Sequence, residues 1–449
     1  MAKAPKAKTK AVKVNFHEQL ILNKWLWSKF NPNRLEGMKQ QLDYPQFEGI
    51  EHEGDNAGQT KFFSVISNTL FNKQVVDIDV LRRYDLNIVK HWQKITEKRN
   101  EIEGHVLNLK YFQYLSLLFS ELYLDQYFNH QAEMLKELNV ELEQYNDDQK
   151  IDADQFQQYL PEDLNKIGYW NATGSGKTLL MHVNILQYLD YFQHQNGDST
   201  YPDQIILLTP NEGLSEQHLQ ELTDSGFQAT LFDKQKSRNS LYRDEIQIID
   251  MNKLSDTDGD KTVATMSLEG KNLVLIDEGH RGTSSSAGAW MERRDILTKD
   301  GFSFEYSATF GQAVSKADNV YKRFEDAKKQ KAKMLYGVAI NKLTEEQKKN
   351  IQLDDLEQQK YRREALREVY AKSILFDYSY KYFYADGYGK EVNILNMKEY
   401  HEDDERNLYL TACLLSFYQQ QYLFKKNQAK LAKFNIEKPL WVFVGNKVN

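Results

Sequence analysis

A glycine-rich loop between a short strand and a helix constrains this chain more than any other feature. Ala172-Thr173-Gly174-Ser175-Gly176-Lys177-Thr178 follows the predicted strand Gly168–Asn171 and precedes the apolar helical segment Leu179–Tyr188. Glycines let backbone N–H groups approach a phosphate chain closely, and a helix N-terminus adds the positive end of its dipole. This context predicts a phosphate-binding loop rather than a turn with an incidental lysine, although Asn171 stands where the strict pattern has glycine.

The loop also indicates which side chains would hold a nucleotide. Residues 173–178, which are Thr173, Gly174, Ser175, Gly176, Lys177 and Thr178, are expected to surround the phosphates. Lys177 is expected to reach the β- and γ-phosphates. Thr178 is expected to provide a hydroxyl ligand to Mg²⁺. The sequence therefore predicts a site for a nucleotide with its metal ion.

Short apolar runs alternate with helical segments after Ile167. This alternation predicts βαβ units and a mostly parallel sheet, so the loops that follow the strands meet at one carboxyl edge. The predicted strands are Gly168–Asn171, Gln204–Thr209, Ala229–Phe232, Glu245–Asp250, Asn272–Ile276 and Phe302–Ser307.

Two adjacent carboxylates end one of these strands. Asp277 lies 100 residues after Lys177, and Glu278 and His280 follow it. Asp277 is expected to hold Mg²⁺ and Glu278 to polarise the attacking water as a general base. His280 is expected to sense the γ-phosphate or to connect to the next motif. An Asp-Glu pair after a strand would by itself more often be a solvated loop, but its pairing with the phosphate loop favours catalysis.

Two further strand ends carry small polar residues. Ser307 and Thr309 are expected to transmit the nucleotide state between domains. Thr209, Pro210 and Asn211 form a turn that is expected to grip a nucleic-acid phosphate, a contact that positions a strand without reading its sequence. The competing interpretation of this turn is a plain helix cap at Ser215.

These elements, in this order, resemble the superfamily 2 helicases, and most closely the DEAD/DEAH-box family that is like the type III restriction enzyme Res subunit. Four segments are similar to motifs I, Ia, II and III: WNATGSGKTLLMHVNILQY, IILLTPNEGLSEQH, LVLIDEGHRG and FEYSATF. The upstream segment LKYFQYLSLLFSELYLDQYF also resembles this family, and its Gln113 corresponds to the glutamine that contacts adenine in related helicases.

The resemblance implies a fold and a set of ligands. The fold is α/β, with two RecA-like P-loop NTPase domains, ATP and Mg²⁺ in the cleft between them, and DNA across both. The second domain normally supplies an arginine finger from motif VI. Motifs V and VI are not in this sequence, and KPLWVFVGN at 438–446 resembles only the first strand of a second domain. A C-terminal continuation, or a modification or specificity subunit, is therefore an expected partner.

The sequence divides into five predicted regions. They are a flexible basic tail at 1–14, a mainly helical region at 15–104, a RecA-like ATPase domain at 105–312, a charged helical segment at 313–372, and the beginning of a truncated second RecA-like domain at 373–449. Within the ATPase domain, the acidic residues 136–166 are expected to form a surface connection.

Composition excludes several classes of protein. The single cysteine, Cys413, excludes an intramolecular disulfide framework and a cysteine-cluster zinc site, which fits a cytoplasmic location. No apolar run approaches the roughly 20 residues of a membrane span. The net charge of −7 excludes a globally basic surface but not local basic stripes. The basic runs at 328–333 and 360–368 are more often solvated helix faces than a DNA path.

The sequence is compatible with three functions. The first is an ATP-dependent DNA translocase or helicase module of a type III restriction or anti-phage system. The second is a nucleotide- and DNA-binding sensor without efficient ATP turnover, because the arginine finger is missing. The third, a P-loop kinase or GTPase, is disfavoured by the motifs that follow the phosphate loop. We expect this chain alone to bind ATP–Mg²⁺ but to hydrolyse it poorly.

Overall fold

The computed structural model describes most of the chain, which forms two compact units. The described residues are 15–71, 77–149, 155–197, 200–233, 244–255, 262–278, 293–317, 320–363, 365–389, 403–431 and 438–442. One unit extends to Gly389, and the other begins at Lys390. The predicted tail at 1–14 lies outside the described residues.

A seven-stranded sheet forms the centre of the first unit. Its order is β3-β4-β2-β7-β8-β1-β9, and every pairing in it is parallel. The strands are β1 (Lys166–Asn171), β2 (Ile205–Thr209), β3 (Ala229–Leu231), β4 (Ile246–Asp250), β7 (Leu273–Asp277), β8 (Phe302–Ser307) and β9 (Ile374–Tyr378), and a separate pair comprises β5 (Leu254–Ser255) and β6 (Val263–Ala264). The sheet confirms all six predicted strands and the α/β class.

Helices precede the sheet, alternate with its strands and follow it. The α-helices of the first unit include α1 (Ile21–Trp27), α2 (Leu35–Leu42), α3 (Lys61–Val65), α4 (Ile78–Glu103), α5 (Tyr111–Asn129), α6 (Gln131–Asp147), α7 (Lys177–Asn196), α8 (Glu212–Asp224), α10 (Phe310–Ala317), α11 (Val320–Tyr336), α12 (Glu345–Asn350), α13 (Asp355–Arg363), α14 (Leu366–Ser373) and α15 (Tyr380–Ala385). The helices before Gly104 agree with the helical region predicted at 15–104. Helix α6, however, occupies residues expected to form a surface connection.

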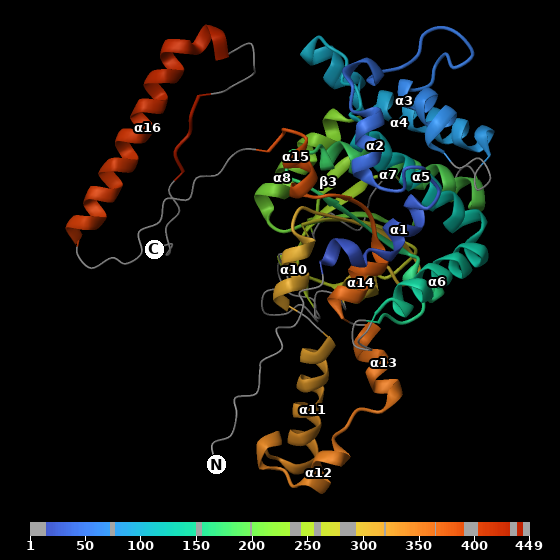
Figure 1. Ribbon diagram of the computed structural model, residues 1–449, viewed down its shortest axis with the longest axis vertical. Coiled ribbons are helices and arrows are strands. Elements are labelled where there is room, and N and C mark those ends of the chain that lie inside the picture. The colour runs from blue at the N-terminus through green and yellow to red at the C-terminus, as the bar shows by residue number, and fades with distance from the viewer. Residues whose placement is uncertain are drawn as a thin grey trace. The chain divides into compact units, whose positions relative to one another are not determined.

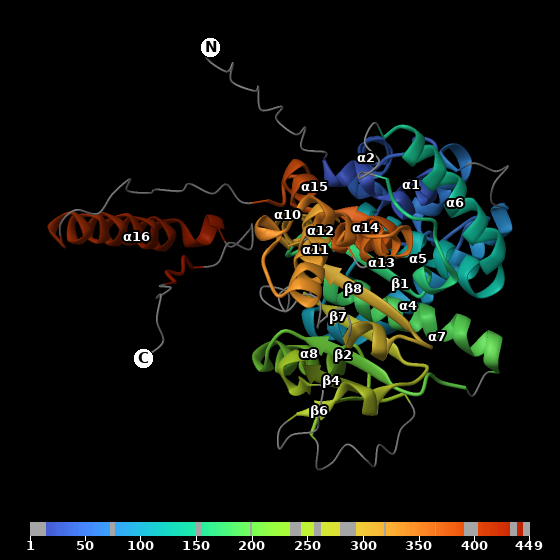
Figure 2. The ribbon, with the colours of Figure 1, turned by 90° about the horizontal axis from the view of Figure 1, so that it is seen from below.

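Alternate residues of the buried strands face two different hydrophobic cores. On β2, Ile205 and Leu207 pack in the larger core, whereas Ile206 and Leu208 pack in the second core. The larger core includes residues of α5 and α7, and the second includes residues of α10 and α14. Figure 2 shows α4, α5 and α7 on one side of the sheet and α10 and α14 on the other. Such a three-layer arrangement presents the carboxyl ends of the strands along one open edge.

Strand β9 corrects one predicted boundary. The sequence places residues 373–449 in a second RecA-like domain, but β9 pairs with β1 and completes the sheet of the first. Residues up to Gly389 belong to the same compact unit. The strand ILFDY lies at the edge of the sheet, but all five of its residues are buried, as expected of a strand whose faces are covered by helices.

The second unit contains one long described helix, α16 (Asp403–Leu431). In the segment at 438–446 that resembles the first strand of a second domain, residues 438–442 adopt no regular structure, and 443–446 lie outside the described residues. The assignment of residues 390–449 to a second RecA-like domain therefore stays a prediction. Cys413 lies on this helix and is half-buried. No helix in the described part of either unit is both long enough and apolar enough to cross a bilayer.

Candidate nucleotide site

The phosphate loop connects β1 to the N-terminus of α7 at the carboxyl edge of the sheet. Gly174 and Gly176 both have a φ of +87°, a region that residues with a side chain rarely adopt. Helix α7 begins at Lys177. Its first N–H groups have no partners within the helix, so they face the loop as donors for an anion. Ser175 is buried and its hydroxyl has no hydrogen-bond partner. These groups fit a phosphate chain.

Gln113 clamps the start of α5 to this loop. Its Oε1 accepts a hydrogen bond from the Lys110 N–H at 3.0 Å, and its Nε2 donates to the Ser175 carbonyl at 3.0 Å. A Cβ on Gly176 would lie 2.5 Å from the same Nε2. The left-handed backbone conformation therefore favours glycine at 176, and a side chain there would displace the amide of Gln113. The contact of Gln113 with adenine stays a prediction.

Lys177 meets the acidic motif directly. Its Nζ lies 2.5 Å from Oε1 of Glu278, and both side chains are only 13% exposed. The other oxygen, Oε2, accepts a hydrogen bond from the Ser307 hydroxyl at 3.2 Å. The Thr309 N–H in turn donates to the Ser307 oxygen at 3.0 Å. Residues from three separate predicted motifs thus converge on one carboxylate.

The two adjacent carboxylates point to different partners. Asp277 ends β7, and Glu278 follows with a φ of +54°, which is uncommon for a residue other than glycine. This turn separates the side chains: Glu278 contacts Lys177, whereas Oδ2 of Asp277 lies 3.0 Å from Nε2 of His218. A non-glycine residue in a sparsely populated conformation is commonly found at functional sites.

His218 is a site residue that the sequence analysis missed. It is buried on α8 and is the last residue of the segment IILLTPNEGLSEQH, which resembles motif Ia. Its position at the end of that segment was the available signal. Trp170, on the strand that leads into the phosphate loop, is buried and donates from Nε1 to the Ala308 carbonyl at 3.1 Å. It therefore joins β1 to the segment that carries Ser307 and Thr309.

The segment after β9 also lies against the phosphate loop. The Ala172 N–H donates to the Tyr378 carbonyl at 2.9 Å. The ring of Phe383 on α15 lies 3.5 Å from where a Cβ on Gly174 would stand. The aromatic sequence YSYKYFYADGY at 378–388 was the available signal. It was missed because the segment was assigned to another domain.

The predicted nucleic-acid turn is partly buried. The Thr209 hydroxyl is fully buried and lies 2.6 Å from the Ser215 hydroxyl, so the side chain is not presented to a ligand. Asn211 caps α8, because its Oδ1 accepts from the Leu214 N–H at 3.0 Å. The cap is thus at Asn211 rather than at Ser215. DNA contacts of Pro210 and of the exposed Asn211 stay predictions.

Two predicted roles have no test in this structure. His280 lies outside the described residues. Thr178 and Asp277 have the oxygen ligands that Mg²⁺ prefers, and their joint role as metal ligands stays a prediction. Among the described residues, no group of three or more His, Cys, Asp or Glu side chains forms a metal site.

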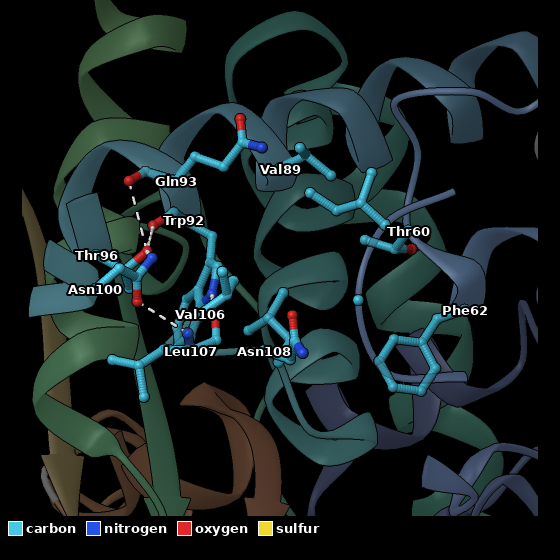
Figure 3. A pocket seen from close by; sticks show the side chains of 13 residues that line it. Thr60, Phe62, Val89, Trp92, Gln93, Thr96, Asn100, Val106, Leu107 and Asn108 are labelled. Carbon is cyan, nitrogen blue, oxygen red and sulfur yellow. Dashed lines mark hydrogen bonds between the residues drawn. The ribbon is translucent and has the colours of Figure 1, made fainter. Parts of the chain in front are cut away.

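A small pocket of about 60 Å³ lies apart from these residues, between α4 and the segment 106–109. Figure 3 shows Trp92, Thr96 and Asn100 of α4 on its wall. Trp92 Nε1 donates to the Leu107 carbonyl at 2.7 Å, and Asn100 Oδ1 accepts from the Leu107 N–H at 2.8 Å. None of the predicted site residues lines this pocket, so it contributes nothing to the nucleotide site.

Comparison with known protein families supports the resemblance to the Res subunit. Residues 125–312 match the protein family described as type III restriction enzyme, res subunit. This match confirms the resemblance drawn from the four motifs, and together with the parallel sheet it is consistent with a RecA-like fold. No curated protein matches the chain.

Proposed function

We propose that this chain is the ATP-dependent DNA translocase module of a restriction or anti-phage system, because residues 125–312 match the family described as type III restriction enzyme, res subunit. The family supports a helicase-like ATPase module in general. We infer in addition that the module moves along DNA and that it acts in defence. The observation that carries the proposal is the convergence of Lys177 and Ser307 on the Glu278 carboxylate.

Each converging residue has a distinct role in the proposed reaction. Lys177 exchanges Glu278 for the β- and γ-phosphates when the nucleotide binds, which leaves the carboxylate to orient and polarise the attacking water. The backbone amides around Gly174 and Gly176 hold the phosphate chain. Mg²⁺, when bound through Thr178 and Asp277, would neutralise charge on the phosphates.

The neighbouring contacts suggest how hydrolysis is communicated to DNA. Ser307 touches Glu278, and the Thr309 N–H touches Ser307 just before α10 begins. A change at Glu278 would therefore reach α10 through two hydrogen bonds. His218 on α8 is similarly placed, because it contacts Asp277 while the N-terminus of the same helix carries Asn211. Both routes lead from the nucleotide to surfaces where a nucleic acid would bind.

The experiment is ATP hydrolysis by the purified chain with and without duplex DNA, together with equilibrium ATP binding. We expect ATP to bind, and slow turnover to rise on addition of DNA. Turnover is expected to be slow because an arginine finger contributes about 10³–10⁵-fold in related hydrolases. Lys177→Ala should abolish both binding and turnover. Lys299→Ala removes an exposed lysine that pairs with Glu269, and it should change neither.

The outcomes separate the two candidate functions. DNA-stimulated turnover that requires Lys177 supports the motor. ATP and DNA binding without any turnover would instead support the nucleotide-dependent sensor. ATP binding that is equal in the wild type and Lys177→Ala would refute both.

A further inference from the structure

A helical arm is inserted between the Ser307–Thr309 segment and β9. It comprises residues 320–363, which form α11, the short helix η9 (Ile340–Lys342), α12 and α13. Figure 1 shows α11 and α12 extending from the end of the unit where α10 and α14 lie. The arm is thus an addition to the sheet rather than one of its covering helices.

The arm is held together by its own contacts. Ala332, Leu343 and Ile351 form a small hydrophobic core that is separate from the two cores of the sheet. The Asn350 Nδ2 donates to the Tyr336 hydroxyl at 3.0 Å, and Lys331 Nζ lies 2.5 Å from a Glu357 oxygen. These contacts join α11 to α12 and to α13, so the arm has a defined shape.

The charge of the arm is opposite to that of the chain. Residues 320–363 contain 12 Lys or Arg and 7 Asp or Glu, a net charge of +5, whereas the whole chain carries −7. A basic element on an acidic protein creates a local positive field. This field attracts a polyanion to the arm, although the chain as a whole is negatively charged.

Three exposed lysines lie close in sequence to the residues of the small core. Lys333 and Lys342 are the sequence neighbours of Ala332 and Leu343, and Lys349 lies two residues before Ile351. Among the described residues none of the three has an acidic partner, whereas Lys328, Lys329 and Lys348 each pair with an acid one helical turn away. Lysines without a carboxylate partner keep their charge available for phosphate groups.

The base of the arm is attached to the nucleotide site. Helix α10 starts directly after Thr309, and the Phe310 ring packs at 4.6 Å from the ring of Tyr370 on α14. The chain therefore leaves the sheet next to Ser307 and returns beside the same helix. Helix α10, which precedes the arm in the chain, thus begins three residues after Ser307, whose hydroxyl contacts Glu278.

We propose that the arm is a second contact for duplex DNA, which binds the phosphate backbone through Lys333, Lys342 and Lys349. This inference rests on the proposed function, because it takes DNA as the track. The contact is independent of sequence, since lysine ammonium groups bind phosphates as point charges. It lies outside the motifs through which the family was identified.

The test is duplex DNA binding by the full chain, measured by fluorescence anisotropy between about 50 and 200 mM salt. The arm variant is Lys333→Gln, Lys342→Gln and Lys349→Gln. The matched control, Lys94→Gln, Lys136→Gln and Lys271→Gln, removes the same charge from exposed lysines elsewhere in the first unit. ATP binding is measured for both variants, and it should equal that of the wild type because no substituted residue belongs to the nucleotide site.

We expect the arm variant to bind DNA at least tenfold more weakly at the lower salt. Its plot of log affinity against log salt should be shallower by about 3, because each lost phosphate contact removes about 0.9 from the slope. The control should change both values much less. Equal losses in the two variants, or no loss in the arm variant, would overturn the arm proposal alone. A wild-type chain that binds ATP but no duplex DNA would overturn the arm proposal and the DNA part of the proposed function together.

Discussion

The nucleotide site and the arm use charged side chains in opposite ways. At the sheet edge, Lys177 and Glu278 are almost buried and lie in contact. On the arm, Lys329 is 63% exposed and pairs with Asp326 at the surface. A buried charge needs a partner in a defined geometry, whereas an exposed pair is screened by salt and contributes little to stability. Substitutions at the site should therefore affect chemistry, and those on the arm should affect salt-dependent binding.

The largest expected effect is that of Glu278→Gln on ATP hydrolysis. The amide keeps the size of the side chain but cannot act as a general base, so the rate should fall about 10²–10⁴-fold. Single-turnover assays with excess protein would measure this rate even where turnover is slow. Glu269→Gln, which alters an exposed ion pair with Lys299, is the matched control. A Glu278→Gln chain as fast as the wild type would show that this carboxylate is structural.

A second comparison concerns the two kinds of hydrophobic core. Leu275 is fully buried in β7, so Leu275→Ala should lower the free energy of unfolding of the sheet by about 2–5 kcal/mol. Leu343 belongs to the small core of the arm, so Leu343→Ala should mainly increase protease cleavage within 320–363. Thermal unfolding and limited proteolysis would measure the two effects. Equal losses of thermal stability would mean that the arm and the sheet unfold as one unit.

A smaller effect is expected from glycine substitution in the phosphate loop. Gly176→Ala should cost about 1–2 kcal/mol for its left-handed backbone and also displace Gln113 from Ser175. Gly226→Ala is the control, because Gly226 has a φ of +82° but open space where a Cβ would stand. Chemical denaturation should show the larger loss for Gly176→Ala, and only this variant should weaken ATP binding. Equal losses would mean that the Gln113 contact adds nothing to stability.

The last expected effect is a pH dependence of stability that originates at Glu121, a buried residue of α5. Burial raises the pKa of Glu121 to about 7, although Tyr191, Gln187 and Asn87 donate hydrogen bonds to it. The folded chain therefore holds this proton more tightly than the unfolded chain, and stability falls as the pH rises from about 4.5 towards 7. The free energy of unfolding of Glu121→Gln, relative to that of the wild type, should therefore be higher at pH 8 than at pH 5. A difference in unfolding free energy that does not vary with pH would contradict this assignment.

The sequence predicted most of the site because its spacing and strand context are local signals. The loop at 172–178 and the carboxylates at 277 and 278 follow buried apolar runs, and parallel strands bring their ends to one edge. The fold class and all six predicted strands follow from the same alternation. Their register and order could not be predicted, since these depend on packing between strands far apart in the chain.

Other features were missed for identifiable reasons. Strand β9 was placed in another domain because a 60-residue stretch of charged helices precedes it, and helical insertions hide the continuity of a sheet. Helix α6 was expected to be a connection, although Met134, Leu138, Leu142 and Tyr145 recur at helical spacing and are buried. The polar composition of this segment led to the prediction of a connection in spite of this helical spacing. The contact of His218 with Asp277 joins α8 to β7, and no local pattern encodes such a pairing.

The most direct test of the account is equilibrium ATP binding by three chains: the wild type, Lys177→Ala and Glu278→Gln. If Lys177 leaves Glu278 to hold phosphate, Lys177→Ala should lose binding. Glu278→Gln should bind at least as tightly as the wild type, because its lysine no longer has an anionic partner to leave. Equal loss of binding in both variants would contradict the account, since it would show that the Lys177–Glu278 pair only stabilises the fold.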